Sequence, residues 1–290
     1  MVFTLRPSTS PPQFAPGRPG SQLPVEVCVL YVGDRTPTSA GPADQFLGAN
    51  NDFSGTCGDV CGRRRGHPLT PPDLTHIDTW LFDLDHTLYP PTAPVLRLVE
   101  DRIRDYMTDL TGLPSDEAWA LQKRYLDEYG GAVAGLVKHH DVDPHAFLAF
   151  VHDVSLESLS PEPALQAALA RLPGRRLVFT NGSQAHAERV LEALALTALI
   201  DDVFHTEAAG MIMKPDPRAF AALIAAHAVT PTTTCFFEDR VDNLRPAAAL
   251  GMTTVLVGQD AQASTARFVD HRTAALAGFL TSARVRDAYP

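Results

Sequence analysis

The sequence has few cysteines and no long apolar run. Four cysteines in 290 residues are too few for a disulfide scaffold. No run approaches the ~20 apolar residues that a membrane span requires. Basic residues are also scarce, 24 against 34 acidic ones, which gives a formal net charge of −10. These shortages exclude a disulfide-rich domain and a membrane-spanning protein, and we expect a soluble, cytoplasmic protein.

The acidic balance also restricts the partners. Binding to nucleic acid or to an anionic membrane surface needs clustered Lys and Arg, so we expect neither partner. Apolar residues make up 45% of the chain, an ordinary share for a globular protein with a sizeable core. Any phosphate that this protein binds must therefore be held by a few local groups against the overall charge.

The first 72 residues differ in composition from the rest. Twenty of them are Pro or Gly, about 28%, which is typical of low-complexity or disordered segments. Cys57 and Cys61 form a C-x-x-x-C pair in this segment, but no second Cys/His pair with zinc-ligand spacing follows. We expect residues 1–72 to form a disordered Pro/Gly-rich extension without a zinc site.

From Ile77 onward, short apolar segments alternate with helix-like segments. This alternation is typical of a parallel α/β sheet flanked by helices. Ser183 can cap one of the helices, and Asp216 followed by Pro217 marks the start of another. The expected strands are Thr79–Leu84, Arg176–Thr180, Val203–Thr206, Thr234–Phe237 and Thr254–Val257.

One interval of about 90 residues, between the first and second expected strands, contains no convincing strand. Its apolar and aromatic residues recur at spacings of three and four, which predicts helices. The three expected faces are Leu96, Val99, Ile103, Met107 and Leu110; Trp119, Gln122, Tyr125 and Tyr129; and Phe147, Phe150 and Val151. We expect residues 91–161 to form a helical cap domain, and residues 73–90 and 162–290 to form the α/β core domain.

Two of the expected strands end in acidic pairs. Asp83 and Asp85 follow the first strand, and because they are two apart on an extended chain, both carboxylates point the same way. Glu238 and Asp239 follow the fourth strand. Such carboxylates need a nearby cation or a shared proton, and Mg²⁺ suits them because it accepts few carboxylates and keeps room for phosphate oxygens. Taken alone, each pair could equally cap a loop.

Two other strand ends carry groups that suit an anion. Thr180, Asn181 and Gly182 lead from the second strand into a helix, whose exposed N–H groups can hold a phosphate. Lys214 follows the third strand, next to prolines that stiffen its backbone. Because the carboxyl ends of parallel strands meet at one edge of a sheet, we expect all four motifs to converge.

In chain order the motifs read D-x-D-x-T, T-N-G-S, K-P-D-P and E-D-x-x-x-N. This set resembles the haloacid dehalogenase (HAD) superfamily over about residues 77–280. Within it, FDLDHTLYPP, FTNGSQAHAERVL, FFEDRVDNLRPAAALGMTTVLV and the cap segment around YLDEYGGAVAGLV resemble the pyrimidine 5′-nucleotidase subgroup. The resemblance implies a HAD-like Rossmannoid core with an inserted helical cap. His86 and Arg240 depart from the family pattern, which more often has Gly or Asn, and a small residue, at these positions.

The resemblance further implies a Mg²⁺-dependent phosphomonoesterase. Asp83 would be the nucleophile that forms an aspartyl-phosphate, and Asp85 the general acid and base. Haloacid dehalogenation needs no second acid, so Asp85 argues against a dehalogenase. The implied Mg²⁺ ligands are Asp83, the backbone carbonyl of Asp85, Glu238 and Asp239. The implied phosphate-binding residues are Thr180, Asn181, Gly182 and Lys214.

Substrate choice is expected to come from the cap, with Tyr125, Tyr129, Gly130 and His152 as candidate contacts. Aromatic faces can stack on a base, but the two tyrosines could instead pack the interior of the cap. The subgroup resemblance implies a small phosphate ester, the nucleoside monophosphates UMP and CMP. A sugar-phosphate phosphatase, a phosphomutase and a non-catalytic binding domain remain alternatives.

Overall fold

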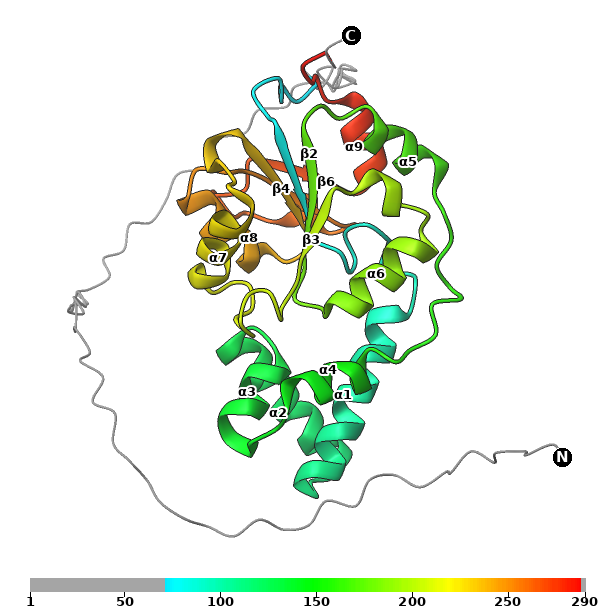
Figure 1. The fold of residues 1–290 in the computed structure, drawn as a ribbon, viewed down its shortest axis with the longest axis vertical. Helices are drawn as coiled ribbons and strands as arrows, with labels where there is room; N and C mark the ends of the chain where they lie inside the picture. The colour runs from blue at the N-terminus through cyan, green and yellow to red at the C-terminus, as the bar shows by residue number, and fades with distance from the viewer. Residues whose placement is uncertain (1–70, 288–290) are drawn as a thin grey trace, which may run out of the picture. The chain divides into compact units, whose positions relative to one another are not determined.

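The computed structural model describes residues 71–287 (Figure 1). The predictions for residues 1–70, including Cys57 and Cys61, lie outside this range. The strands are β1 (Thr79–Phe82), β2 (Arg175–Phe179), β3 (Asp202–Phe204), β4 (Thr234–Glu238), β5 (Thr253–Val257) and β6 (His271–Thr273). The α-helices are α1 (Val95–Thr111), α2 (Ser115–Tyr129), α3 (Ala132–His140), α4 (Pro144–Val151), α5 (Pro163–Ala170), α6 (Gln184–Ala193), α7 (Pro217–His227), α8 (Val241–Ala249) and α9 (Leu276–Ser282).

The six strands form one parallel sheet in the order β3-β2-β1-β4-β5-β6. Phe82 of β1 lies opposite both Val178 of β2 and Phe237 of β4. The strand order reverses between β1 and β4, and in open α/β sheets ligands bind outside the carboxyl ends at such a reversal. The predicted fold class, a HAD-like parallel α/β sheet flanked by helices, is confirmed.

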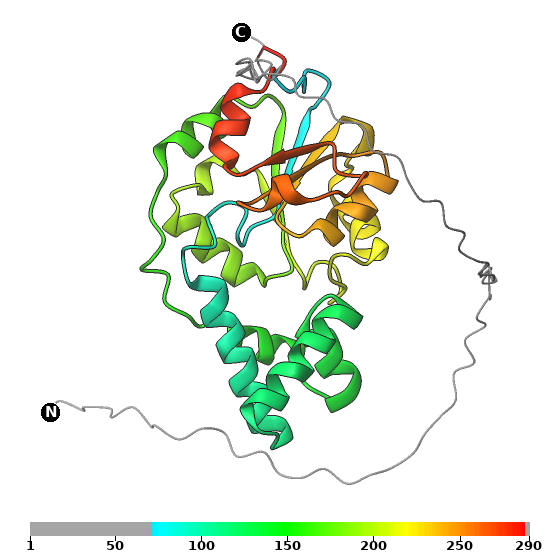
Figure 2. The same cartoon turned by 180° about the vertical axis from the view of Figure 1, so that it is seen from behind.

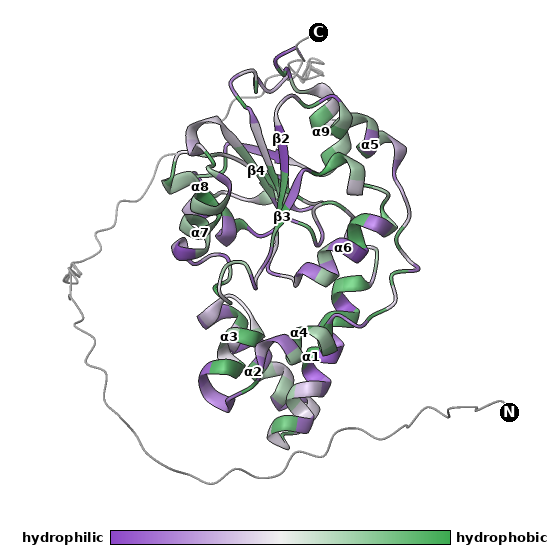
Figure 3. Ribbon diagram, in the orientation of Figure 1, coloured by the Kyte–Doolittle hydropathy of each residue, from purple (hydrophilic) through white to green (hydrophobic). Residues whose placement is uncertain are grey.

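Helices cover both faces of the sheet, so its central strands are buried on both sides. Trp80 and Phe82 of β1 belong to the apolar cluster under α5, α6 and α9, whereas Leu81 belongs to the cluster under α7 and α8. Figures 1 and 2 show these layers from the two sides, and in Figure 3 helices α5, α8 and α9 are apolar along much of their length. Full burial of each such large side chain is worth about 1.5–3 kcal/mol, which explains the near-continuous apolar strands.

The five predicted strands are present, with ends that differ by one or two residues. The predicted caps are confirmed as well: the Ser183 side chain accepts from the His186 N–H, and the Asp216 side chain from the Arg218 N–H. Strand β6 was not predicted. It has three half-buried residues, His271–Thr273, at the edge of the sheet, so it has no apolar run to reveal it.

Helices α1 to α4 form a helical insertion (residues 95–151) between β1 and β2, grouped at one end of the sheet in both views (Figures 1 and 2). Met107, Tyr125 and Phe147 are among its buried residues. The expectation that Leu110 and Phe150 lie on buried faces is wrong, since they are 42% and 39% exposed. Leu110 lies in the last turn of α1, and Phe150 packs under the Arg102 guanidinium.

Over the described residues, the structure contains no helix long and apolar enough to cross a membrane.

Candidate active site

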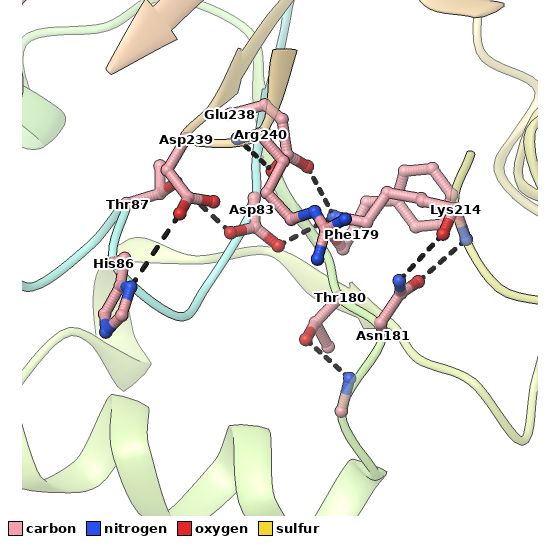
Figure 4. A network of polar contacts seen from close by, with 11 residues as sticks. Asp83, His86, Thr87, Phe179, Thr180, Asn181, Lys214, Glu238, Asp239 and Arg240 are labelled. Atoms are coloured by element: carbon pink, nitrogen blue, oxygen red, sulfur yellow. Dashed lines mark hydrogen bonds and ion pairs between the residues drawn. The ribbon is translucent and has the colours of Figure 1, made fainter. Parts of the chain in front are cut away.

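Three carboxylates meet where β1 and β4 end (Figure 4). Asp83, Glu238 and Asp239 each place one oxygen within 4.8 Å of the others. The pairing of β1 with β4 brings them together, and the Asp83 N–H donates to the Phe237 carbonyl at 2.9 Å. Hard oxygen donors from a few carboxylates are what Mg²⁺ prefers, so this acidic cluster fits the predicted metal.

A buried ammonium group lies beside the acidic cluster. Lys214 is 1% exposed, and its Nζ donates to Asp83 Oδ1 at 2.7 Å, Glu238 Oε2 at 2.9 Å and the Phe179 carbonyl at 2.6 Å. These three bonds use all its donors. Asn181 fixes the Lys214 backbone, accepting from its N–H at 2.8 Å and donating to its carbonyl at 3.0 Å. The second and third motifs are therefore joined directly.

The cluster carries more negative than positive charge. Burial raises the pKa of Asp83 and of Glu238 to about 7, in each case against the opposing charge of Lys214. Burial and the charge of Asp83 raise the pKa of Asp239 to about 6. Burial alone would lower the pKa of Lys214, but Asp83 and Glu238 outweigh it and raise that pKa. Three carboxylates around one ammonium favour the binding of a further cation.

Addition of Mg²⁺ is expected to stabilise the chain more at pH 8 than at pH 5. Because the folded-state pKa values of the acidic cluster are raised, the metal-free fold loses stability as pH rises from about 4 to about 7. A metal binds the ionised carboxylates, so above about pH 7 its binding offsets the stability that the metal-free fold has lost. At 100 times its Kd, Mg²⁺ should add about 2.7 kcal/mol, or roughly 5–10 °C in Tm. Thermal melts in Mg²⁺ and in EDTA at both pH values test this prediction. An equal rise in Tm at pH 5 and pH 8 would contradict it. The variant Asp239→Asn should show a smaller rise in Tm, because it removes one of the three carboxylates.

The loop after β2 presents the predicted anion-binding groups. Thr180 is 2% exposed, and its Oγ1 accepts from the Gly182 N–H at 2.8 Å. A Cβ on Gly182 would lie 3.2 Å from that Oγ1 and 3.1 Å from the His186 ring, so this position favours glycine. The loop and the acidic cluster both lie along the same cavity.

Asp85 lies apart from the acidic cluster. Its Oδ1 accepts from the Tyr89 hydroxyl at 2.5 Å and lies 2.9 Å from His186 Nε2, which donates because an ionised carboxylate only accepts. Burial opposes ionisation, but the charge and hydrogen bond of His186 and the Tyr89 hydrogen bond outweigh it and lower the pKa of Asp85 to about 2. Only the backbone carbonyl of Asp85 was expected to bind the metal, and that expectation stays a prediction.

His86 adopts a φ of 64°, in the left-handed region that favours Gly and Asn. This backbone explains why Gly or Asn is more usual at that position in the pattern that the sequence resembles. The His86 Nδ1 lies 3.8 Å from Asp239 Oδ2, and burial lowers the pKa of His86. The histidine thus flanks the acidic cluster on the side opposite Lys214 (Figure 4).

A cavity of about 180 Å³ lies between the strand ends and the helical insertion. Asp83, Asp85, Thr180 and Lys214 line one side. The insertion lines the other with mainly apolar side chains: Leu96, Val99, Ile103, Leu126, Val133, Phe147, Leu148 and Val151. The structure thus brings together all the residues predicted for the four core motifs.

Of the four predicted substrate contacts on the insertion, two line the cavity and two do not. Gly130 and His152 line it. Tyr125 and Tyr129 instead pair their hydroxyls with His140 and His139, each at 3.0 Å. Tyr125 is buried, as the alternative of interior packing expected, whereas Tyr129 is half-buried and packs against the same apolar cluster.

Gly130 joins the helical insertion to the loop of Lys214. Its φ is 78°, and a Cβ there would lie 2.6 Å from the Lys214 carbonyl oxygen. Neither the backbone conformation nor the close approach is open to a larger residue. The end of α2 is therefore in contact with the strand-end loops.

Three further residues at the site were not predicted as functional: Tyr89, Gln122 and His186. Gln122 lines the cavity and is 4% exposed, and its Oε1 has no hydrogen-bond partner among residues 71–287. His186 could have been noticed, since it lies in the first turn after the Ser183 cap, on the buried face with Val190. The helical spacing placed Gln122 on an inward face but could not distinguish a cavity from a packed interior.

Comparison with known proteins agrees with this geometry. A family model described as haloacid dehalogenase-like hydrolase matches residues 77–251. Phosphate metabolism protein 8 of Saccharomyces cerevisiae is 28% identical over 215 residues, 67% of this chain and 67% of that protein. The phosphatase MT3486 of Mycobacterium tuberculosis is 34% identical over 100 residues, 34% of this chain and only 46% of that protein. A HAD phosphatase from Thermococcus onnurineus has the same fold, with a TM-score of 0.50 at 18% identity over 72% of this chain and 100% of that one.

Proposed function

The chain belongs to the haloacid dehalogenase-like hydrolase family, and from this membership we propose that it is a Mg²⁺-dependent phosphomonoesterase acting on pyrimidine nucleoside 5′-monophosphates. The observation that carries the proposal is the second carboxylate. Asp85 follows Asp83 on the same loop, lines the same cavity and has its own hydrogen-bond partners. A nucleophile and a separate acid are the two groups that phosphate-ester cleavage requires.

The proposed reaction proceeds in two displacements. An Asp83 oxygen attacks phosphorus, the bond from phosphorus to the ester oxygen breaks, and that oxygen takes a proton from Asp85. Water then attacks the aspartyl-phosphate and gives a proton to Asp85, which releases inorganic phosphate and restores Asp83. Although the pKa of Asp85 is about 2 without substrate, a phosphate dianion beside it raises its proton affinity, because like charges disfavour ionisation.

The remaining residues hold the phosphate. Lys214 contributes the positive charge of its ammonium group, and the Thr180 hydroxyl and the Asn181 backbone N–H donate to oxygens whose charge must be stabilised during transfer. Asp83, Glu238 and Asp239 would hold Mg²⁺. When bound, the metal supplies positive charge that neutralises the approaching phosphate.

The insertion side of the cavity supports a nucleoside as the leaving group, with its base against the helical insertion. Apolar side chains suit the faces of a flat ring, and Gln122 supplies one amide among them. An amide both donates and accepts, so by rotating it can pair with the imide edge of uracil or the amino edge of cytosine. The names of the relatives agree with the reaction class, since one is a phosphatase and the other a phosphate metabolism protein.

Gln122→Leu is expected to lower kcat/KM for UMP and CMP by about 5- to 150-fold, since a good bidentate contact to a base is worth about 1–3 kcal/mol. The aryl ester p-nitrophenyl phosphate offers no base edge and should be hydrolysed almost as before. Gln166→Leu is the matched control, because among the described residues the Gln166 side chain bonds only the backbone carbonyls of Leu194 and Ala195, outside the cavity. An equal loss for all three esters would count against base recognition.

Phosphate release tests the proposed function. UMP, CMP, AMP, GMP, glucose phosphates and phosphoglycolate are offered with Mg²⁺ and with excess EDTA. Release that needs Mg²⁺ and is concentrated on UMP and CMP is the expected result. Release spread over sugar phosphates or phosphoglycolate would support phosphomonoester hydrolysis but contradict the proposed nucleotide substrate. No release from any ester would contradict the proposed phosphatase activity.

A further inference from the structure

We infer that His186 is a positioning residue that, with Tyr89, orients Asp85 for proton transfer. The inference rests on the proposed function, because it concerns how the general acid of that reaction is held. The two oxygens of the Asp85 carboxylate have different surroundings. Its Oδ1 contacts both the Tyr89 hydroxyl at 2.5 Å and His186 Nε2 at 2.9 Å.

The other oxygen of Asp85 faces the phosphate-binding loop. A Cβ built on Gly182 would lie 3.8 Å from Asp85 Oδ2 and 3.2 Å from Thr180 Oγ1. Two donors on Oδ1 fix the rotation of the carboxylate about its Cβ–Cγ bond, which directs Oδ2 toward this loop. One oxygen is thus anchored, and the other is left to carry the proton.

The His186 ring is itself held in one orientation. It is 1% exposed and stacks on His152 with ring centroids 4.4 Å apart and an interplanar angle of 19°. Ser183 Oγ accepts from the His186 backbone N–H at 3.2 Å and contacts His152 Nδ1 at 2.9 Å. The His186 Nδ1 is buried without a hydrogen-bond partner within the described part of the chain. The bond to Asp85 is therefore the one polar link that the ring makes there.

The stacking partner belongs to the end of the helical insertion. His152 directly follows the last residue of α4 and caps that helix, and its carbonyl accepts from Arg189 Nη1 at 2.8 Å. Arg189 also donates to the Val154 carbonyl at 2.7 Å. Helix α6 thus makes two contacts: Arg189 bonds the segment that leads out of the helical insertion, and His186 bonds Asp85. A histidine that merely filled space would need no such set of contacts.

Loss of the His186 donor should lower kcat/KM most for the esters whose leaving group is most basic, because these leaving groups need a proton. A dinitrophenolate leaves without protonation, whereas an alkoxide does not. The dependence of kcat/KM on leaving-group basicity therefore reports how well Asp85 delivers its proton. A purely structural role would instead lower kcat/KM by the same factor for every ester.

The experiment measures kcat/KM for 2,4-dinitrophenyl, p-nitrophenyl, phenyl and alkyl phosphates with the full chain and Mg²⁺. His186→Phe keeps the stack on His152 but removes the donor. We expect about a 10²-fold loss for the alkyl ester, within the range of general acid catalysis, and little loss for the dinitrophenyl ester. His186→Gln, whose amide can donate again, should recover part of the loss. Tyr89→Phe removes the other donor to Oδ1 and should steepen the dependence of kcat/KM on leaving-group basicity in the same way. This second variant keeps the inference testable if His186→Phe does not fold.

The control is a second histidine–carboxylate pair at the opposite edge of the sheet. His227 ends α7, and its Nδ1 lies 3.7 Å from Asp202 Oδ2, where β3 begins. His227→Phe should leave the leaving-group dependence unchanged. A loss equal for all esters, or no loss, in His186→Phe and Tyr89→Phe would overturn the positioning role while the unchanged chain still releases phosphate. If the unchanged chain released none, the proposed function would fail and the inference with it.

Discussion

Asp83→Asn is expected to lower kcat/KM for UMP by roughly 10⁴- to 10⁶-fold, since removal of a nucleophile can cost about 10⁶. The same substitution should not destabilise the fold. Burial raises the pKa of Asp83 to about 7, so its ionisation reduces the stability of the metal-free fold as pH rises from about 4 to 7. Asparagine resembles the protonated acid, so the variant in EDTA should be at least as stable as the unchanged chain at pH 8, and equally stable near pH 4.

Steady-state kinetics and denaturant unfolding measure the two effects together. Asp78→Asn is the matched control, because Asp78 precedes β1 at the opposite edge and, within residues 71–287, its side chain bonds only the hydroxyls of Thr79 and Thr233. It should leave kcat/KM unchanged. Phosphate release by Asp83→Asn at a rate near that of the unchanged chain would show that another group attacks phosphorus.

Lys214→Met is expected to reduce both activity and stability. Loss of one group that stabilises developing charge costs about 10²–10³ in kcat. The substitution also leaves Asp83 and Glu238 buried without their ammonium partner, and breaking a buried ion pair costs about 3–5 kcal/mol. Without Lys214 the pKa values of these carboxylates rise further, so the loss of stability should be largest at pH 8 and much smaller at pH 5, where both are protonated.

Urea unfolding at the two pH values in EDTA measures this dependence. Lys123→Met offers the contrast, since Lys123 is half-exposed on α2 and pairs with Glu100 at 3.2 Å. Exposed pairs of this kind contribute about 0–1 kcal/mol. A Lys214→Met variant as stable at pH 8 as the unchanged chain would show that the ammonium does not compensate the buried carboxylates.

Much of the fold could be predicted because the strands and the motifs that follow them are recognisable from short stretches of sequence. Apolar strands ended in polar motifs, and parallel pairing then required those motifs to share one edge. Asp83 and Glu238 lie side by side for that reason, although they are far apart in sequence. Strand β6 could not be predicted, because edge pairing alone makes it a strand.

The surroundings of Asp85 lay beyond sequence analysis because they depend on tertiary packing. Nothing in the spacing joins Asp85 to His186, whose meeting requires β1 and α6 to be placed by the sheet. The insertion shows the same limit. Tyr125 and Gln122 lie on one predicted helical face, yet only Gln122 lines the cavity. Helical periodicity identifies inward residues but not what they face.

The most direct test of the central claim is to look for the aspartyl-phosphate. The chain is mixed with UMP labelled at phosphorus in the presence of Mg²⁺, quenched in acid within one turnover, and digested. We predict label on the peptide that contains Asp83, released by hydroxylamine and absent from Asp83→Asn. Label on a different peptide, or an unlabelled chain while labelled phosphate is being released, would contradict the account.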